Sequence, residues 1–194
     1  SLSSYPHMEI SMYINVIVIF LTIPFPWILL TIMHILQRYF PKRFKFFRLG
    51  TAIWIHTSSI LLPCIFSMVL CNFVGRVRPD FYSRCGNKAT KDTCTILSNK
   101  ELRDEFRSFP SISSTMAVSS MTFFSLFLLK LCIDSSTWLH CIFLIPLMLG
   151  FWVGSLSIKY YHSHTDDIIA GYFIGGICCW IMWEGSSKRI FKPY

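Results

Sequence analysis

The sequence predicts an all-α integral membrane bundle with about five transmembrane helices. The 194-residue chain is 53% hydrophobic but only 14% charged, with a mean hydropathy of +0.51, whereas soluble globular domains carry about a quarter charged residues. Its apolar runs are also long enough to cross a bilayer as helices, which takes about 20 residues each. None of them alternates strictly as a barrel strand does, and a helix satisfies its own backbone groups in lipid.

Five apolar stretches support this prediction in chain order, and together they form one expected membrane domain over residues 1–194. They cover residues 8–37, 50–74, 110–133, 137–158 and 167–184. The first stretch is interrupted by Pro24 and Pro26, and the third opens on Pro110, a residue type that suits the first turn of a helix. A polar outer loop, 76–109, and a basic inner loop, 38–48, connect the early spans.

Positive charge gathers in two short segments that a five-span chain places on the same side of the membrane. One lies between the first two spans and the other follows the last; their basic residues are Arg38, Lys42, Arg43, Lys45, Arg48, Lys188, Arg189 and Lys192. The positive-inside rule makes that side cytoplasmic or its organellar equivalent, so we expect the outer loop to be lumenal or extracellular. The net charge of +8 is also typical of nucleic-acid binding, but the juxtamembrane position favours membrane lipids, and we expect no nucleic-acid partner.

Most of the eight cysteines lie in apolar spans, where cysteine behaves as a small buried hydrophobe. Cys85 and Cys94 instead lie together in the polar outer loop. A disulfide between them and a pair of free thiols both stay open; an oxidising compartment permits the disulfide. The chain has no C-x-x-C pair, and we expect no metal site and no cofactor.

Three polar clusters lie at the outer ends of spans, over residues 72–80, 106–114 and 155–167. Arg76 and Arg78 in the first cluster are suited to bind an anion, because guanidinium groups match phosphate oxygens. Ser111, in the second, lies where the N–H groups of a helix start can receive phosphate. The third adds imidazoles and carboxylates, from His162, His164, Asp166 and Asp167. Ordinary helix capping and arginines reaching toward head groups explain the same residues, and both interpretations stay open.

The clusters resemble the three signature motifs of the type 2 phosphatidic acid phosphatase family, the lipid phosphate phosphatases. The family's motifs read K-x6-R-P, P-S-G-H and S-R-x5-H-x3-D. Here residues 71–81 read C-N-F-V-G-R-V-R-P-D-F, residues 106–114 read F-R-S-F-P-S-I-S-S, and residues 152–171 read W-V-G-S-L-S-I-K-Y-Y-H-S-H-T-D-D-I-I-A-G. The resemblance covers nearly the whole chain. It implies helices two to six of a six-helix core, with the usual first helix missing, upstream or supplied by another chain.

The resemblance also implies a metal-independent site. In the family, the His of the third motif attacks phosphorus, an Asp orients it, and the His of the second motif protonates the leaving group. A Lys, two Arg residues and the backbone of the second motif hold the phosphoryl oxygens. Five of these roles are empty in this chain, at Cys71 (Lys), Ile112 (Gly), Ser113 (acid His), Ser157 (second Arg) and Ser163 (nucleophile). Arg78, Ser111 and the orienting carboxylate Asp167 are retained.

We therefore expect a catalytically inactive pseudoenzyme that serves as a structural or lipid-binding subunit of a membrane assembly. Its expected partners are other proteins of that assembly and membrane lipids, with a phospholipid head group held by Arg76, Arg78 and Ser111. The alternative is an active phosphatidate or lipid phosphate phosphatase with a relocated nucleophile. His162 and Asp166 have the H-x3-D spacing shifted by one residue, a shift that turns a helical side chain by about 100°.

Overall fold

The structure is a computed structural model that describes residues 11–86, 93–94, 96–132, 141–159 and 163–191. Its helices are α1 (Ser11–Thr22), α2 (Pro24–Tyr39), α3 (Leu49–Val74), α4 (Phe81–Cys85), α5 (Asn99–Glu105), α6 (Ile112–Leu131), α8 (Ile145–Lys159) and α9 (Thr165–Ile190). No strand is found in the described part of the chain, where Phe44 and Cys132 form an isolated bridge. The predicted all-α bundle is confirmed.

Five helical segments are long and apolar enough to cross a membrane, as the sequence predicts. They are Val16–Tyr39, Leu49–Val74, Ile112–Leu131, Cys141–Lys159 and Thr165–Ile190. The last helix extends to Ile190, beyond the apolar stretch that ends near Glu184, because its amphipathic end packs Ser187 and Ile190 inward. The protein is an integral multi-pass membrane protein.

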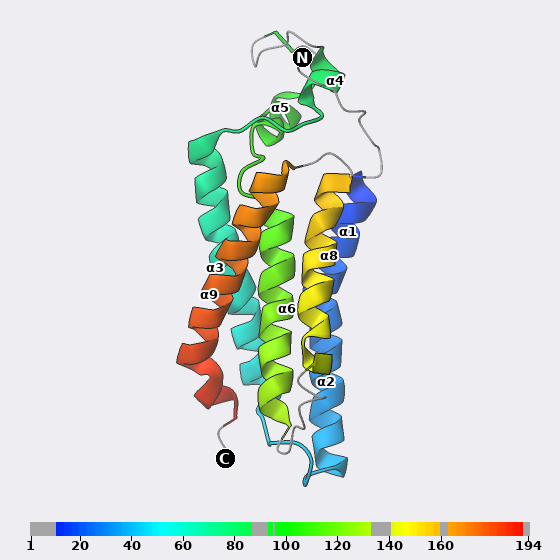
Figure 1. Ribbon diagram of the computed structural model, residues 1–194, viewed down its shortest axis with the longest axis vertical. Helices are drawn as coiled ribbons and strands as arrows, with labels where there is room; N and C mark the ends of the chain where they lie inside the picture. Colours follow the sequence, from blue (N-terminus) through cyan, green and yellow to red (C-terminus); the bar gives the residue numbers. More distant parts are fainter. Residues whose placement is uncertain (1–10, 87–92, 95, 133–140, 160–162, 192–194) are drawn as a thin grey trace.

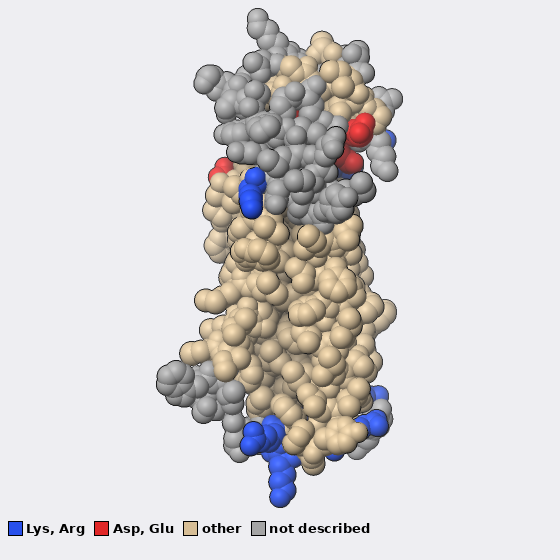
Figure 2. Space-filling view, turned by 90° about the vertical axis from the view of Figure 1, so that its right-hand side faces the viewer, with Lys and Arg blue, Asp and Glu red and all other residues tan. Residues whose placement is uncertain are grey.

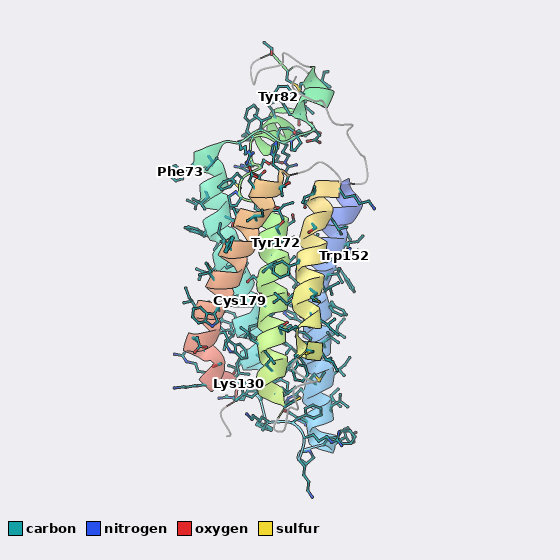
Figure 3. All side chains as sticks on the ribbon, in the orientation of Figure 1. Phe73, Tyr82, Lys130, Trp152, Tyr172 and Cys179 are labelled. Atoms are coloured by element: carbon teal, nitrogen blue, oxygen red, sulfur yellow. A yellow bond between two sulfur atoms is a disulfide. The ribbon has the colours of Figure 1, made fainter. Side chains whose placement is uncertain are left out.

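The central helix of the bundle is α6. The most apolar window of this span is 61% buried, against 22–33% in the other four spans. Figure 1 shows α6 between α9 and α8, with α3 behind α9 and the α1–α2 span behind α8. The side chains of Phe73 on α3 and Trp152 on α8 point away from the bundle (Figure 3) and are 84% and 59% exposed. Such apolar exposure is normal where lipid is the solvent.

Glycines let α9 lie against the backbone of α6. A Cβ at Gly171 would lie 2.7 Å from the Ser111 carbonyl oxygen, and one at Gly175 would lie 2.5 Å from the Thr115 carbonyl oxygen. These positions form a G-x-x-x-G pair, the spacing that lets membrane helices approach closely. The contact holds the start of α9 beside the start of α6.

Prolines leave two carbonyls without their helical donors, and serines of α6 replace those donors. Pro26 lacks the N–H that would bond the Thr22 carbonyl, and Ser120 Oγ donates to that oxygen at 2.7 Å. Pro63 likewise frees the Ser59 carbonyl, which accepts from Ser119 Oγ at 2.5 Å. These two bonds fasten the α1–α2 span and α3 to the central helix.

Both ends of the bundle are covered by connecting segments. At the end predicted to be outer, α4 and α5 rise above the helices (Figure 1), and a disulfide joins Cys85 to Cys94. Apolar side chains pack around it, from Phe81, Leu97 and Leu102. At the opposite end, predicted to be inner, the connection between α2 and α3 crosses beneath α6.

Candidate functional site

The first two polar clusters are joined by backbone hydrogen bonds above α3. Gly75 ends α3 in the left-handed conformation (φ 61°), which glycine adopts at little steric cost. The chain then runs beside the segment that precedes α6. The Arg78 N–H donates to the Glu105 carbonyl at 2.9 Å, and the Ser108 N–H donates to the Arg76 carbonyl at 3.1 Å. This pairing brings the two arginines of the first cluster to the start of α6.

The third cluster joins the second through the helix starts. The Ser111 N–H donates to the Asp167 carbonyl at 2.9 Å, which fixes the first turn of α9 against the residue that precedes α6. The Ser163 N–H donates to the Ser157 carbonyl at 3.4 Å and folds the end of the connection from α8 over the same place. All three clusters therefore converge at one end of the bundle.

Asp167 is the centre of the polar contacts. Its side chain is fully buried. One carboxylate oxygen accepts from Arg76 Nη1 at 2.6 Å. The other accepts from the Ser108 hydroxyl, from the His164 N–H at 3.0 Å, and lies 3.3 Å from His164 Nδ1. The carboxylate also lies in the first turn of α9, where the helix dipole favours negative charge.

Asp166, the next residue, has a different environment. Its side chain is 74% exposed and lies 3.4 Å from Arg76 Nη2. Of these two neighbouring carboxylates, the buried one is Asp167, to which the family resemblance assigns the orienting role. His162, the proposed relocated nucleophile, lies outside the described residues. His164 is half-exposed and directed at Asp167.

Arg76 contacts these carboxylates, although the sequence suggests it as a phosphate ligand. Its guanidinium bridges Asp166 and Asp167. The cationic side chains that line the cavity beside the start of α6 are Arg78 and Arg107. Within the described ranges, the Arg78 guanidinium has no carboxylate partner, and Arg107 lies 3.6 Å from a carboxylate oxygen of Asp104.

Arg78 and Arg107 line a cavity of about 360 Å³ beside the start of α6. Its polar wall continues with four serines, and its apolar wall comes from α1 and α6. The other lining residues are Val18, Ile19, Ser108, Ser111, Ile112, Ser113, Met116 and Ser163. A smaller cavity of about 220 Å³ shares Arg78, Arg107 and Ile112 and reaches Cys71. The arrangement offers two cations, neutral hydroxyls and an apolar flank.

Three of the five positions that the resemblance marks as emptied line this cavity, and a fourth, Ser157, is hydrogen-bonded to one of them. Ser113 and Ser163 line it, and Ser113 Oγ lies 2.9 Å from the Oγ of Ser157. Ile112 lines it as well, so a branched side chain occupies the place where the family motif has glycine. None of these four side chains is cationic or titrates near neutral pH.

The fifth emptied position, Cys71, lies deeper. Its side chain is 1% exposed, and the thiol donates to the Pro110 carbonyl at 3.3 Å. A lysine at this position would bring a positive charge to the smaller cavity. The cysteine brings none and acts as a packed, hydrogen-bonded side chain.

Arg107 and Ser108 are site residues that sequence reasoning missed. Arg107 lies three residues before Pro110, in the quoted second motif, and its charge was the available signal. Its place opposite Arg78 follows from the backbone pairing above α3, which a one-dimensional motif does not display. No group of three or more metal-binding side chains is found among the described residues.

Comparison with known proteins gives the family. Residues 52–191 match the family model of the PAP2 superfamily. The chain is 30% identical over 154 residues to the probable diacylglycerol pyrophosphate phosphatase 1 of Schizosaccharomyces pombe, covering 69% of this chain and 54% of that protein. It is 27% identical over 153 residues to diacylglycerol pyrophosphate phosphatase 1 of Saccharomyces cerevisiae, covering 72% and 50%.

A plant relative matches a shorter part of the chain. The chain is 27% identical over 128 residues to lipid phosphate phosphatase 2 of Arabidopsis thaliana, covering 60% of this chain and 44% of that protein. The chain spans about half the length of the curated relatives that it matches. No solved structure is a significant match. Because the family match runs from the second span through the last helix, the chain belongs to the PAP2 superfamily.

Proposed function

We propose that this chain binds the phosphate head group of a membrane lipid in the cavity of Arg78 and Arg107 and does not hydrolyse it. One observation carries the proposal. The cavity keeps two guanidinium groups, while serines stand where the family motifs have the acid and the nucleophile. The site is thus equipped to hold an anion and lacks the groups that would break its ester bond.

The binding half of the proposal follows from charge and shape. Each of the two planar guanidinium groups can donate a pair of hydrogen bonds to phosphate oxygens, and Ser111 and Ser113 offer neutral hydroxyl donors. Val18 and Ile19 of α1 add an apolar wall beside the polar one. A ligand with a phosphate at one end and an acyl chain at the other fits this division better than free phosphate does.

The chemical class of the ligand comes from the relatives. Two of them are named for diacylglycerol pyrophosphate and a third for lipid phosphates. We therefore expect the ligand to be a lipid with a terminal phosphate or pyrophosphate. Such a head group carries more negative charge than a phosphodiester and would gain more from two arginines.

The absence of hydrolysis follows from what the reaction needs. A nucleophile must form a bond to phosphorus while the leaving oxygen receives a proton. Ser163 would need a base to remove its proton, and Ser113 cannot supply a proton near neutral pH. Loss of one electrostatic donor can cost about 100-fold or more in rate, and the charges at Cys71 and Ser157 are lost as well.

A structural role in a membrane assembly belongs to the same proposal. The helices that frame the site are kept, while the side chains that would perform catalysis are not. A protein of this kind can order a bound lipid, or present its outer cap of α4 and α5 to other chains. Purification in mild detergent tests this part, since a structural subunit would bring stoichiometric partners with it.

The test uses the purified chain in lipid nanodiscs with diacylglycerol pyrophosphate and phosphatidate as probes. Binding should be saturable and should weaken at least tenfold in Arg78→Gln, because one charge-assisted contact is lost. Lys159→Gln is the matched control, since it removes one charge near the same end of the bundle outside the cavity. Phosphate release that disappears in His162→Ala would support the relocated nucleophile and overturn the proposal.

A further inference from the structure

A second cationic cavity lies at the predicted inner end of the bundle. It is at the other end of the membrane-spanning helices from the cavity of Arg78 and Arg107. It has a volume of about 300 Å³ and lies between the end of α2 and the start of α3. His34 and Arg38 line it from α2, Arg48 and Phe46 from the connection, and Gly50 and Thr51 from the first turn of α3. The residues that line it carry positive charge or no formal charge.

The connection that forms one wall is held in place by a buried glutamine. Gln37 is 4% exposed. Its Oε1 accepts from the Phe47 N–H at 3.1 Å, and its Nε2 donates to the Phe47 carbonyl at 3.4 Å. The Phe47 ring is fully buried and packs edge-on against Phe127 of α6, with ring centres 4.8 Å apart.

Two further backbone bonds tie the same segment to the ends of other helices. The Lys45 N–H donates to the Leu131 carbonyl at 2.7 Å, and the Arg48 N–H donates to the Ile190 carbonyl at 3.0 Å. The wall is therefore attached to α2, α6 and α9 at once. These hydrogen bonds fix the position of the segment that forms one wall of the cavity.

The position of this cavity relative to the bilayer points to its ligand. Arg38 lies in the last turn of the Val16–Tyr39 span, and Arg48 immediately precedes the Leu49–Val74 span. Both arginines thus lie at the level of lipid head groups. Basic pockets between membrane helices at this level bind anionic head groups.

The surroundings carry mostly positive charge. Figure 2 shows Lys and Arg side chains gathered at the lower end of the molecule, beneath a wide band without charge. Lys130 lies near this end of α6 (Figure 3), where its Nζ donates to Ser187 Oγ at 2.9 Å. The local potential therefore attracts anions. The half-exposed Phe46 ring and Leu49 supply apolar surface beside the arginines.

We propose that the inner cavity binds the phosphate head group of an anionic phospholipid from the leaflet opposite the first site. Arg38 and Arg48 contact the phosphate, and the apolar side chains beside them contact the upper part of the acyl chains. The chain would then hold one lipid at each face of the membrane. This inference does not depend on the function proposed for the outer cavity.

The experiment uses native mass spectrometry of the detergent-purified chain, titrated with phosphatidylserine or phosphatidylcholine. We expect a single phosphatidylserine adduct to form at concentrations where phosphatidylcholine does not bind. Arg38→Gln together with Arg48→Gln should weaken it roughly 25-fold, since each cation near a membrane surface contributes about fivefold. Equal retention of the two lipids by the unaltered chain would overturn the proposal.

Matched variants separate a site from general surface attraction. Lys188→Gln with Arg189→Gln removes the same charge from the same end but leaves the cavity residues intact, and should weaken binding less than about threefold. Equal losses in the two double variants would contradict a defined site. Lys159→Gln, near the opposite end of the bundle and outside both cavities, should leave phosphatidylserine binding unchanged.

A second pair of variants keeps the test valid if the arginine variant does not fold. A Cβ at Gly50 or at Gly185 meets no atom within 4 Å, so a side chain fits at either position. Gly50→Glu places a carboxylate at the cavity and should abolish the adduct. Gly185→Glu adds the same charge on α9 away from the cavity and should retain it. Retention in both variants would contradict the proposal.

Discussion

The hydroxyl oxygens of Ser113 and Ser157 lie 2.9 Å apart, although 44 residues separate them in the chain. Alignment with the family motifs assigns these positions to the general-acid histidine and to a phosphate-binding arginine. The fold has thus kept the two positions together and filled both with small neutral side chains. Ser157 is only 4% exposed, so its hydroxyl pairs within the protein and faces little solvent.

Restoring the five emptied side chains should create phosphatase activity. The variant combines Cys71→Lys, Ile112→Gly, Ser113→His, Ser157→Arg and Ser163→His. Phosphate release from phosphatidate should rise above the unaltered chain by at least about 100-fold, because a nucleophile, an acid and two cations return together. The four-residue variant that keeps Ser163 serves as the control and should stay inactive. Equal rates in the two variants would contradict the assignment of Ser163.

Asp167→Asn should destabilise the protein by about 3 kcal/mol. The substitution removes the buried carboxylate and leaves the Arg76 guanidinium without its charged partner. The carboxylate is fully buried and holds Arg76 at 2.6 Å. Asp166→Asn is the matched control, because its side chain is 74% exposed and exposed pairs contribute about 0–1 kcal/mol. Thermal unfolding in detergent measures both. Equal shifts in the unfolding midpoint would contradict the buried, ion-paired environment assigned to Asp167 and the exposed one assigned to Asp166.

Gly175→Ala should destabilise the α6–α9 contact by about 1–3 kcal/mol through overpacking. The added Cβ would lie 2.5 Å from the Thr115 carbonyl oxygen, a backbone atom that cannot move alone. The neighbouring Gly176→Ala places its Cβ 3.9 Å from Val118, an ordinary contact, and should be neutral or slightly stabilising since alanine favours helices. Thermal unfolding should give a lower midpoint for Gly175→Ala than for Gly176→Ala. The opposite order would contradict this packing.

Ser119→Ala should cost about 1 kcal/mol, because the Ser59 carbonyl loses the donor that replaces the missing N–H of Pro63. Ser58→Ala is the control. The Ser58 hydroxyl donates at 2.9 Å to the Trp54 carbonyl, four residues back on its own helix, which keeps its helical donor after the substitution. Denaturant titration in mixed micelles would compare the two variants. A larger loss in Ser58→Ala would argue against the proline explanation.

The outer cap should carry an oxidised cysteine pair if the site faces a lumenal or extracellular compartment. Disulfides persist in such compartments and are rare in the cytosol. Alkylation of intact membranes before reduction should leave Cys85 and Cys94 unmodified, while mass spectrometry after reduction should find both labelled. Cys141 is exposed and has a free thiol in the structure. Its alkylation therefore shows that the reagent has reacted with accessible thiols. Labelling of the pair before reduction would place this face in a reducing compartment.

Hydropathy was sufficient to predict the number and type of the spans, because lipid requires long apolar helices. It did not locate every helix end. Residues 187 and 190 belong to the last helix although the apolar run stops near Glu184, since one buried face is enough for packing at a helix end. The break near Ile23 was visible as Pro24 and Pro26, but the serine that satisfies the freed carbonyl lies 98 residues away.

The site shows a similar limit. The order of the spans predicts that the three clusters lie at the same end of the bundle, and the structure brings them together there. It did not distinguish which arginine pairs with a carboxylate and which faces the cavity. Arg76 turns to Asp167, while Arg107 joins Arg78. That choice depends on the backbone pairing above α3, which brings together residues about thirty positions apart.

The central claim is that a lipid phosphate is held and left intact, and the mass of the retained lipid tests it most directly. The purified chain would be loaded with diacylglycerol pyrophosphate, incubated for several hours and analysed by native mass spectrometry. Our account expects the bound lipid to keep the full mass of diacylglycerol pyrophosphate and to be lost in Arg78→Gln. A bound or released product lighter by one phosphate group, absent from a heat-denatured control, would contradict it.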